Sequence, residues 1–447
     1  MVIVRINNGL VREDLGFGTS ASLGLNYLIK DRISSGEELF HFGFGESPFP
    51  VPLPFFQGLI ENAHKNEYLN SQGLLSLREK IIHFHKVQGD FDHFTPDDVV
   101  LAAGSKELIY HMINVFSGDI LMPSPCWMSY APQSVLSNKS YYIIETDFEN
   151  RYIPTARNIE TTLSLTDPDT PKLLILNFPK ISDVCRRNNT IILSDEIYAL
   201  LPEGTVVTSG FSKWASMGGW RAGYALFPSQ LANLKSAVIS AGSHSYSCQT
   251  VPIQYALNYG MDFEDELVDY IDRSKIVLEM CADYTHRELT SVGVKGHPSE
   301  CGYYFMPDFE VVRLADIPNG TELSSRLLNE AKVAVMPCDP DFMGKAGELT
   351  ARLAFINFKG AEAMKNVALL ENNQDFAVNF LDKYCQPLTK GVQATKKWSW
   401  KTEGHKVADV PRKVSGFNLR KLSVDDSRKL SIHDLRKMSI SSIRERF

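Results

Sequence analysis

The chain of 447 residues is 44% apolar and carries a net charge of −7. This length and apolar content predict a substantial core in more than one domain, and no run of about 18 apolar residues predicts a membrane-spanning helix. Seven scattered cysteines without a C-x-x-C pair argue against a metal site or a disulfide framework, and the N-terminus lacks a signal-peptide pattern, so we expect a cytosolic protein.

Short apolar runs alternate with amphipathic stretches in the middle of the chain, which predicts a largely parallel sheet with crossover helices. The predicted strands are 99–104, 118–125, 172–179, 190–195, 205–211 and 222–228, and helical spacing is found at 106–116 and 181–189. Polar residues follow four of these strands, namely Ser105, Trp127, Asp195 and Lys213. Because ligands bind at the carboxyl ends of strands in open sheets, we expect these four side chains to converge.

A change of pattern from about Asp262 to Gln386 predicts a second, smaller α+β domain. Long amphipathic helices are followed there by short predicted strands at 302–309 and 351–358. After Pro387 the apolar periodicity fails, so residues 390–447 are predicted to form a flexible tail. The tail holds 15 Lys and Arg against 6 Asp and Glu, a charge of +9 that leaves −16 on the preceding residues. Those preceding residues show no basic stripe, so we expect no nucleic-acid binding.

The tail contains a repeat of eight residues. RKVS (412–415), RKLS (420–423), RKLS (428–431) and RKMS (436–439) each place two basic residues before a serine. This pattern resembles sites for basophilic protein kinases, with Ser415, Ser423, Ser431 and Ser439 as acceptors. Phosphorylation of all four would add about six to eight negative charges. The alternative is a solvated basic extension without a regulatory role.

The segment GFSKWASMGGWRAG at 210–223 carries the most specific pattern, a lysine among small and apolar residues with an arginine eight positions later. It resembles the cofactor-lysine signature of class I and II aminotransferases, in particular the aspartate aminotransferases, which depend on pyridoxal 5′-phosphate. Matching motifs occur in the family's order over about residues 35–389. The resemblance implies a fold-type I α/β enzyme, with a mostly parallel sheet in its large domain and a smaller α+β C-terminal domain.

The resemblance also implies a division of the chain into four parts. An N-terminal arm and part of the small domain are expected at 1–45, and a cofactor-binding large domain at 46–265. The small domain is expected at 266–389 and the basic tail at 390–447.

By this resemblance, Lys213 forms the Schiff base with the cofactor and then moves the proton between the substrate and the cofactor. Arg221 would bind the cofactor phosphate through its guanidinium group, and Ser212 would add a hydroxyl. Asp195 in SDEIY (194–198) would keep the pyridine nitrogen protonated, and Tyr198 resembles the tyrosine that bonds the cofactor's phenolic oxygen. Outside this context, an acidic residue after a strand is often only a helix cap.

Two further motifs match the cofactor site. Gly104, Ser105 and Lys106 in LAAGSKEL (101–108) lie at a strand-to-helix turn, where main-chain amides and the helix dipole favour a phosphate. Trp127 in PSPCW (123–127) matches an aromatic ring stacked on the pyridine, and its plain alternative is a core tryptophan.

The remaining matches concern the substrate and a second subunit. Tyr68 in EYLNSQGLLSLREK (67–80) matches a tyrosine that reaches the phosphate of the neighbouring subunit, which implies a homodimer. Arg352 in ARLAF matches the arginine that binds the substrate α-carboxylate, with the backbone at Gly45 close to the same group. Lys106 matches a lysine that binds a distal carboxylate in some relatives, which favours aspartate or glutamate; its alternative is a solvent-facing lysine.

The chain departs from the family pattern in two places. No N-P-x-G turn follows the predicted strand LLILNFP, and only 17 residues separate Asp195 from Lys213, so the large domain is apparently shortened twice. The resemblance implies transamination between an amino acid and a 2-oxo acid. The alternatives are a C–S lyase or cyclopropane-forming synthase on the same fold, which would share Lys213, Asp195, Tyr198 and Arg221, or a truncated, inactive relative.

Overall fold

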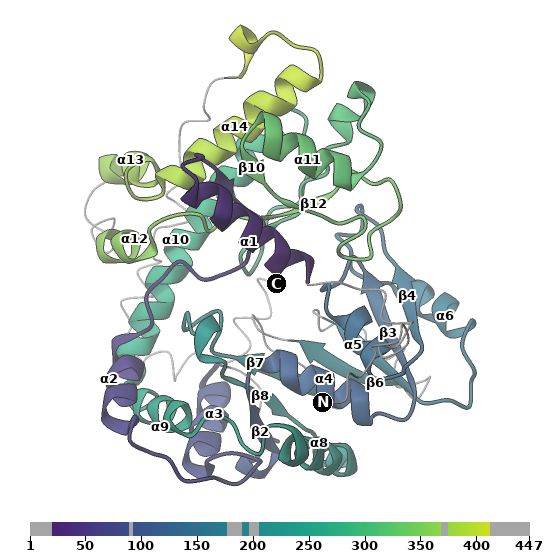
Figure 1. Ribbon diagram of the computed structural model, residues 1–447, viewed down its shortest axis with the longest axis vertical. Helices are drawn as coiled ribbons and strands as arrows, with labels where there is room; N and C mark the ends of the chain where they lie inside the picture. Colours follow the sequence, from purple (N-terminus) through teal and green to yellow (C-terminus); the bar gives the residue numbers. More distant parts are fainter. Residues whose placement is uncertain (1–19, 89–92, 177–189, 196–204, 368–373, 412–447) are drawn as a thin grey trace, which may run out of the picture.

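The computed structural model describes residues 20–88, 93–176, 190–195, 205–367 and 374–411. Within them, seven strands form one sheet in the order β2-β8-β7-β6-β5-β3-β4 (Figure 1). Its strands are β2 (Val99–Ala102), β3 (Asp119–Ser124), β4 (Tyr141–Glu145), β5 (Lys172–Leu176), β6 (Thr190–Asp195), β7 (Thr205–Gly210) and β8 (Gly223–Leu226). Among these seven strands, β8 alone runs opposite to the other six. This confirms the predicted α/β class with a mostly parallel sheet.

Helices cover both faces of this sheet, because alternate residues of a strand point to opposite faces. Val100 in β2 packs with α4 (Ser105–Val115), α5 (Tyr130–Leu136) and α8 (Ala232–Ser245) on one face. Leu101 packs with α2 (Leu53–Asn62), α3 (Leu75–Gln88) and α9 (Val251–Gly260) on the other. The second face also carries α6 (Ala156–Leu163), which packs on Leu121 of β3. The start of α4, directly after β2, therefore lies at the carboxyl edge of the sheet.

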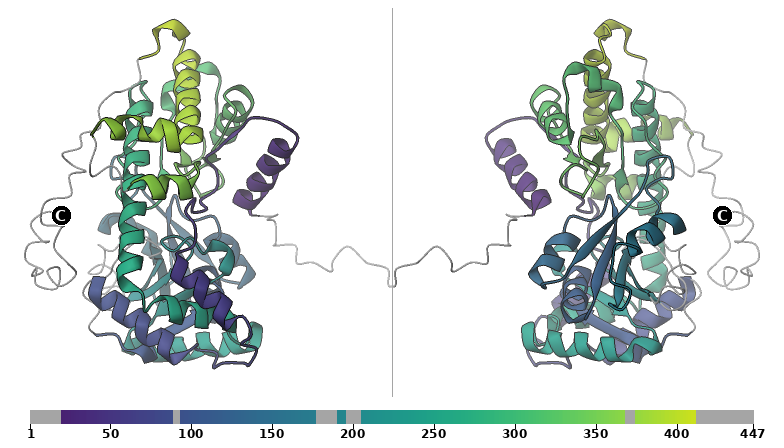
Figure 2. Two further views of the ribbon diagram at one scale, coloured as in Figure 1. Left: turned by 90° about the vertical axis from the view of Figure 1, so that its left-hand side faces the viewer. Right: turned by 90° about the vertical axis from the view of Figure 1, so that its right-hand side faces the viewer.

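A second unit lies above the sheet in Figure 1, and the long helix α10 (Glu264–Thr290) connects the two, as both views in Figure 2 show. Its strands form an antiparallel sheet in the order β11-β12-β9 and a parallel pair of β1 with β10. Their bounds are β1 (Phe40–His41), β9 (Tyr304–Phe305), β10 (Val333–Ala334), β11 (Met336–Pro337) and β12 (Ala351–Ala354). The accompanying helices are α1 (Ala21–Ser34), α11 (Gly320–Glu330), α12 (Gly360–Val367), α13 (Gln374–Tyr384) and α14 (Gln386–Thr402).

The predicted start of the tail at residue 390 is wrong, because α14 continues to Thr402 and is packed into the core of the small unit. The buried face of α14 includes Gly391, Thr395 and Lys396, which explains why apolar periodicity failed there. A Cβ on Gly391 would lie 2.5 Å from the ring of Phe42, so only glycine allows this close approach. Residues 412–447, which hold the four serine repeats, lie outside the described residues.

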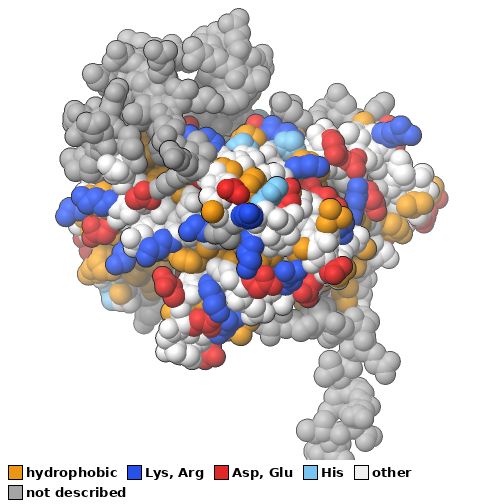
Figure 3. Space-filling view, turned by 90° about the horizontal axis from the view of Figure 1, so that it is seen from above, with side chains coloured by type: hydrophobic (Ala, Val, Ile, Leu, Met, Phe, Trp, Pro, Cys, Tyr) orange, Lys and Arg blue, Asp and Glu red, His pale blue; other side chains and the backbone are white. Residues whose placement is uncertain are grey.

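Neither a membrane helix nor a metal cluster is found in the described parts of the chain. None of their helices is long and apolar enough to cross a bilayer. Their His, Cys, Asp and Glu residues also form no group of three or more that could hold a metal ion. On the face seen in Figure 3, Lys and Arg side chains are interspersed with Asp and Glu side chains over the part of the surface that is described.

Candidate active site

Lys213 lies in the turn that follows β7, and both its amine and its main chain are held in place. Its Nζ donates to the carbonyl oxygen of Gly45 at 2.5 Å and lies 5.6 Å from the centre of the Tyr303 ring. The hydroxyl of Tyr303 donates to the carbonyl oxygen of Lys213 at 2.7 Å. The amine is therefore directed toward the loop at Gly45 and toward Tyr303 of the small unit.

Asp195 ends β6, the central strand of the large sheet. Its carboxylate accepts hydrogen bonds from the hydroxyls of Tyr130, at 2.8 Å, and Thr208, at 3.2 Å. Burial raises the pKa of Asp195, and the two hydrogen bonds and the charge of Lys213 act in the opposite direction. This acid is therefore electrostatically coupled to the amine of Lys213.

Arg221 meets the N-terminus of α4. Its Nη2 donates to the Ala103 carbonyl oxygen and its Nη1 to the Gly218 carbonyl oxygen, both at 3.0 Å. Gly104 is the N-cap of α4 and offers no side-chain cap, so the first amides of the helix stay available. A Cβ on Gly104 would lie 2.5 Å from Nη2 of Arg221, and one on Gly223 would lie 2.3 Å from the nitrogen of Ser105. The two glycines thus allow the helix end and the guanidinium group to come together.

Lys106 and Trp127 link the group formed by Arg221 and the start of α4 to Asp195. The Nζ of Lys106 lies 5.1 Å from the centre of the Trp127 ring, whose neighbour Tyr130 packs edge-on at 5.3 Å and binds Asp195. Partial burial lowers the pKa of Lys106, and the charge of Arg221 lowers it further. Neither cation forms an ion pair with an acidic side chain in the described structure.

Arg352 in β12 is a buried cation that contacts the same glycine loop (43–45) as Lys213. Its guanidinium group packs against the rings of Tyr304 and Phe342, at 4.4 and 4.7 Å, and its Nη2 donates to the carbonyl oxygen of Gly43 at 2.8 Å. The side chain is only 9% exposed, and its Nε has no hydrogen-bond partner. The charge of Arg352 opposes the burial that raises the pKa of Asp341, but among the described residues no carboxylate forms an ion pair with the guanidinium group. A buried guanidinium group of this kind is suited to an anionic ligand.

Gly45 lies beside Lys213, whereas the carbonyl that contacts Arg352 belongs to Gly43. A Cβ on Gly45 would lie 1.8 Å from the Tyr304 hydroxyl oxygen, so a side chain there would displace the ring that packs on Arg352. Residue 45 is therefore restricted to glycine, because Tyr304 occupies the space that a side chain would need.

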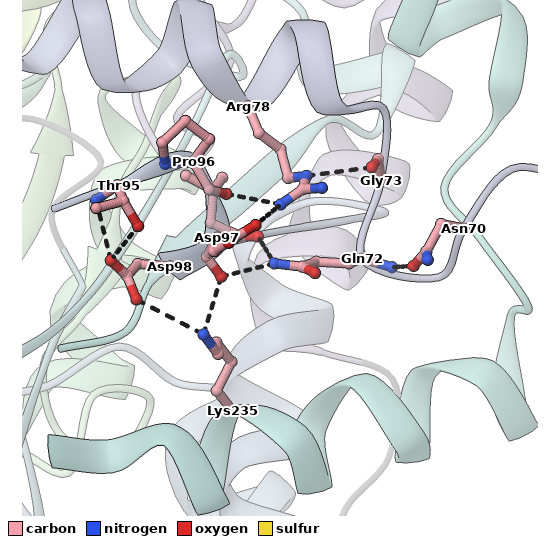
Figure 4. A network of polar contacts seen from close by, with 10 residues as sticks. Asn70, Gln72, Gly73, Arg78, Thr95, Pro96, Asp97, Asp98 and Lys235 are labelled. Atoms are coloured by element: carbon pink, nitrogen blue, oxygen red, sulfur yellow. Dashed lines mark hydrogen bonds and ion pairs between the residues drawn. The ribbon is translucent and has the colours of Figure 1, made fainter. Parts of the chain in front are cut away.

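Tyr68 points into solvent from a firmly held loop. Its side chain is 86% exposed, so it contributes nothing to the site of its own chain. Figure 4 shows how this loop is anchored a few residues later. Gln72 donates to the carbonyl oxygens of Asp97 and Val99, and Arg78 donates to those of Gly73 and Pro96. The loop is thereby fixed to the start of β2 while the ring of Tyr68 stays free to contact another molecule.

The structure brings most of the predicted residues into two chains of contacts. One leads from Asp195 through Tyr130 and Trp127 to Lys106, whose pKa responds to the charge of Arg221. The other joins Lys213 and Arg352 through the carbonyl oxygens of Gly45 and Gly43. Ser212 is half-buried beside Lys213, and its hydroxyl has no hydrogen bond within the described structure. Tyr198 lies outside the described residues.

Sequence reasoning missed the groups that hold these side chains. They are Gly43, Tyr130, Tyr303 and Tyr304. The two adjacent tyrosines carried a usable signal, since neighbouring side chains in a predicted strand point to opposite sides. For Tyr130, at the start of α5, and for Gly43 we find no such signal.

These residues fit pyridoxal 5′-phosphate. The start of α4 with Lys106 and Arg221 offers cations and main-chain amides to a phosphate. Lys213 supplies the primary amine that the aldehyde requires, and Asp195 the carboxylate for a ring nitrogen.

Comparisons with known proteins agree with this fit. The profile of the family "Aminotransferase class I and II" matches residues 57–351. The aspartate aminotransferase of Bacillus sp. (strain YM-2) is 27% identical over 352 residues, which cover 71% of this chain and 88% of the relative. The aspartate aminotransferase of Thermotoga maritima is 28% identical over 350 residues, with the same coverage.

Solved structures show the same fold. The aspartate aminotransferase from Thermus thermophilus with maleate superimposes with a TM-score of 0.72 at 20% identity, over 87% of this chain and all of the other. These findings confirm the fold expected from the resemblance. The chain therefore belongs to the class I and II aminotransferases, a family of enzymes that use pyridoxal 5′-phosphate as their cofactor.

Proposed function

We propose that this aminotransferase transfers the amino group of aspartate or glutamate to a 2-oxo acid. When bound, pyridoxal 5′-phosphate supplies the electron sink that stabilises the negative charge left when the substrate Cα loses its proton. The observation that supports a dicarboxylic substrate is a pair of desolvated cations, Arg352 and Lys106. Neither forms an ion pair with an acidic side chain among the described residues.

Each residue of the site has a role that follows from its surroundings. Lys213 would hold the cofactor and move the proton at the substrate Cα, because its primary amine lies between the glycine loop and Tyr303. Arg352 binds the α-carboxylate through its planar guanidinium group. Asp195, held by Tyr130 and Thr208, faces the ring nitrogen. Tyr198 would bind the phenolic oxygen, as the family resemblance implies.

Lys106 is proposed to bind the distal carboxylate of the substrate. Its partial burial and the nearby charge of Arg221 make an unpaired ammonium group unfavourable, and a carboxylate would relieve this. Because Lys106 belongs to the first turn of α4, the same ammonium group would also help to hold a cofactor phosphate there. A neutral substrate would leave Lys106 without a second partner.

The test is a transamination assay with the Lys106→Ala variant. We expect kcat/KM for aspartate to fall by about 10- to 100-fold, the usual effect of losing a charged hydrogen bond, while that for alanine changes little. Lys86→Ala, on the exposed side of α3, serves as the matched control. Equal losses for both substrates would contradict the dicarboxylate preference. Ammonia release without an oxo-acid acceptor would instead favour a lyase.

We also infer that the enzyme forms a homodimer. Leu53, Phe56 and Ile60 lie three and four positions apart on α2, so they form one stripe, and they are 59, 50 and 64% exposed. Together with the solvent-facing Tyr68, this stripe supports a second copy of the chain as the partner. We expect Ile60→Glu to halve the mass measured by light scattering after size exclusion. An unchanged mass in wild type and variant, equal to one chain, would contradict the dimer.

Phosphorylation of the C-terminal repeats remains a proposal from the sequence. Ser415, Ser423, Ser431 and Ser439 each follow a basic pair, and a basophilic protein kinase would recognise that arrangement. Mass spectrometry of the native protein should find phosphate on at least one of the four serines. Four serines that remain unmodified in all conditions would contradict the proposal.

A further inference from the structure

Two adjacent tyrosines contact the two cations of the active site. The Tyr303 ring lies 5.6 Å from Nζ of Lys213, and the Tyr304 ring lies 4.4 Å from the guanidinium carbon of Arg352. The same two cations donate to the carbonyl oxygens of Gly45 and Gly43. One dipeptide of the small unit and one glycine loop therefore fix the spacing between the amine and the guanidinium group.

A chain of hydroxyl groups starts at Lys213 and ends at Pro50. Tyr303 donates to the Lys213 carbonyl oxygen at 2.7 Å and is also bonded by Ser47. Ser47 contacts the hydroxyl of Ser216 at 2.6 Å, and Ser216 contacts that of Tyr270 at 2.7 Å. Tyr270 donates to the carbonyl oxygen of Pro50 at 2.9 Å. The chain joins the glycine loop, the lysine turn, α10 and the small unit.

Counting hydrogens shows how this chain would respond to losing one member. Four hydroxyls provide four hydrogens for five contacts, and both terminal groups are carbonyls that cannot donate. Without the Tyr303 hydroxyl, three hydrogens remain for three contacts, so Ser47, Ser216 and Tyr270 can still satisfy one another. The Lys213 carbonyl would keep only the weaker bond from the Ser216 amide, at 3.2 Å. Loss of this hydroxyl should therefore affect Lys213 more than the fold.

We propose that Tyr303 is a positioning residue for Lys213. Its hydroxyl holds the lysine main chain and, through Ser47, ties it to the loop whose Gly45 carbonyl receives the amine. Tyr304 positions Arg352 through the packing of its ring on the guanidinium group. The two tyrosines together therefore set the distance between the reactive amine and the carboxylate-binding group. This inference rests on the proposed function of Lys213 and Arg352.

The experiment uses the full chain with Tyr303→Phe, which keeps the ring and removes the hydroxyl. The readout is the rate at which borohydride traps the cofactor on Lys213, with the modified peptide identified by mass spectrometry. We expect trapping and kcat to fall about tenfold, as for one lost hydrogen bond at a reacting group, with an unchanged KM for aspartate and an unchanged melting temperature. Tyr284→Phe, which removes another buried phenol bonded to Gln393, should trap at the wild-type rate.

A double-variant cycle with Ser47→Ala tests whether the two hydroxyls act as one chain. If they do, the double variant is no slower in trapping than the slower single variant. Multiplying effects, or a Tyr303→Phe variant that traps cofactor at the wild-type rate, would overturn the inference alone. A wild-type chain that takes up no label at Lys213 would overturn the proposed function as well.

Discussion

Two charged residues of the active site lie on the central strands of their sheets, and the two strands are supported differently. Arg352 is in β12, all four residues of which are buried, between β11 and β9. Asp195 ends β6, which pairs with both β5 and β7 over several residues. Ile191 and Ile192 of β6 nevertheless remain half-buried, although central strands of parallel sheets are normally covered on both faces.

The difference follows from the lengths of chain around the two strands. Residues 177–189 connect β5 to β6, and only the nine residues 196–204 connect β6 to β7, fewer than the dozen that parallel neighbours usually need. Strand pairing therefore places Asp195, while Arg352 is held by pairing and packing together. A sheet with such a short connection between parallel strands can thus keep the position of a functional group while a central strand remains only partly buried.

The largest expected effect is that of Lys213→Ala, because Lys213 is proposed both to hold the cofactor and to move the substrate proton. We expect activity to fall by about 10⁴-fold, the upper range for a group that transfers protons in place. No cofactor should be trapped on the chain at this position by borohydride. Only the contact to the Gly45 carbonyl and the ring of Tyr303 is lost from the amine, so the melting temperature should change little. Substantial activity in this variant would remove the basis of the comparison.

Asp195→Asn tests whether β6, the less buried of the two strands, holds its carboxylate where the cofactor needs it. The amide keeps the shape and removes the charge, so we expect kcat to fall by about 10³-fold while cofactor is still trapped on Lys213. Asp169→Asn, at an exposed turn, is the control. If kcat of Asp195→Asn stays within about threefold of wild type, β6 does not hold the carboxylate at the cofactor.

Arg352→Gln tests the role of the cation on β12, the fully buried strand. We expect KM for aspartate to rise by about a hundredfold, since a hydrogen-bonded carboxylate partner of a buried charge is worth about 3 kcal/mol. The ligand-free variant should be at least as stable as wild type, because it removes a buried charge that forms no ion pair among the described residues and whose Nε has no hydrogen-bond partner.

Thermal unfolding with and without succinate distinguishes a binding role of Arg352 from a structural one. The dicarboxylate should raise the melting temperature of wild type but not that of Arg352→Gln. The control is Arg151→Gln, which changes an exposed arginine paired with Glu300, and its melting temperature should rise as in wild type. Strong destabilisation of the ligand-free Arg352→Gln variant would mean that the guanidinium group mainly supports the fold.

Sequence patterns predicted the large sheet better than the small unit, for physical reasons. Six of its strands were predicted, because buried parallel strands are continuous apolar runs, and only the half-exposed edge strand β4 was missed. In the small unit the predicted strand at 302–309 shrinks to Tyr304–Phe305. α14 was missed because its buried face includes Thr395, Lys396 and Ser399. A pattern of apolar residues cannot reveal Lys396, whose charge is balanced by the equally buried Glu288 at 2.7 Å.

The residues of the active site likewise divide into those that a sequence pattern reveals and those that it does not. Residues in family motifs, such as Lys213 and Arg221, could be predicted because their chemistry fixes residue type and spacing. Tyr130 and Gly43 could not, since they act through hydrogen bonds between segments far apart in sequence.

The smallest expected effect concerns Glu348, four residues before Arg352. Burial, helped by the charge of Asp339, raises the pKa of Glu348 to about 7, and its Oε1 has no hydrogen-bond partner. The unfolded chain has a pKa near 4.5 for this group, so the folded state binds the proton more tightly. Its stabilising contribution is therefore fully present below about pH 4.5 and is lost as the pH rises through 7.

Glu348→Gln replaces the acid by a neutral group and should remove this pH dependence. We expect the variant to be about 1 to 2 kcal/mol more stable than wild type at pH 8 and similar to it at pH 5, less than the full shift would give because the side chain is partly exposed. Denaturant unfolding at pH 5, 6, 7 and 8 measures the difference, with the exposed Glu362→Gln as the control. Parallel curves for wild type and variant would mean that Glu348 is hydrated. The loop before β12 would then be covered no better than β6, and the contrast between the two strands would be limited to the strands themselves.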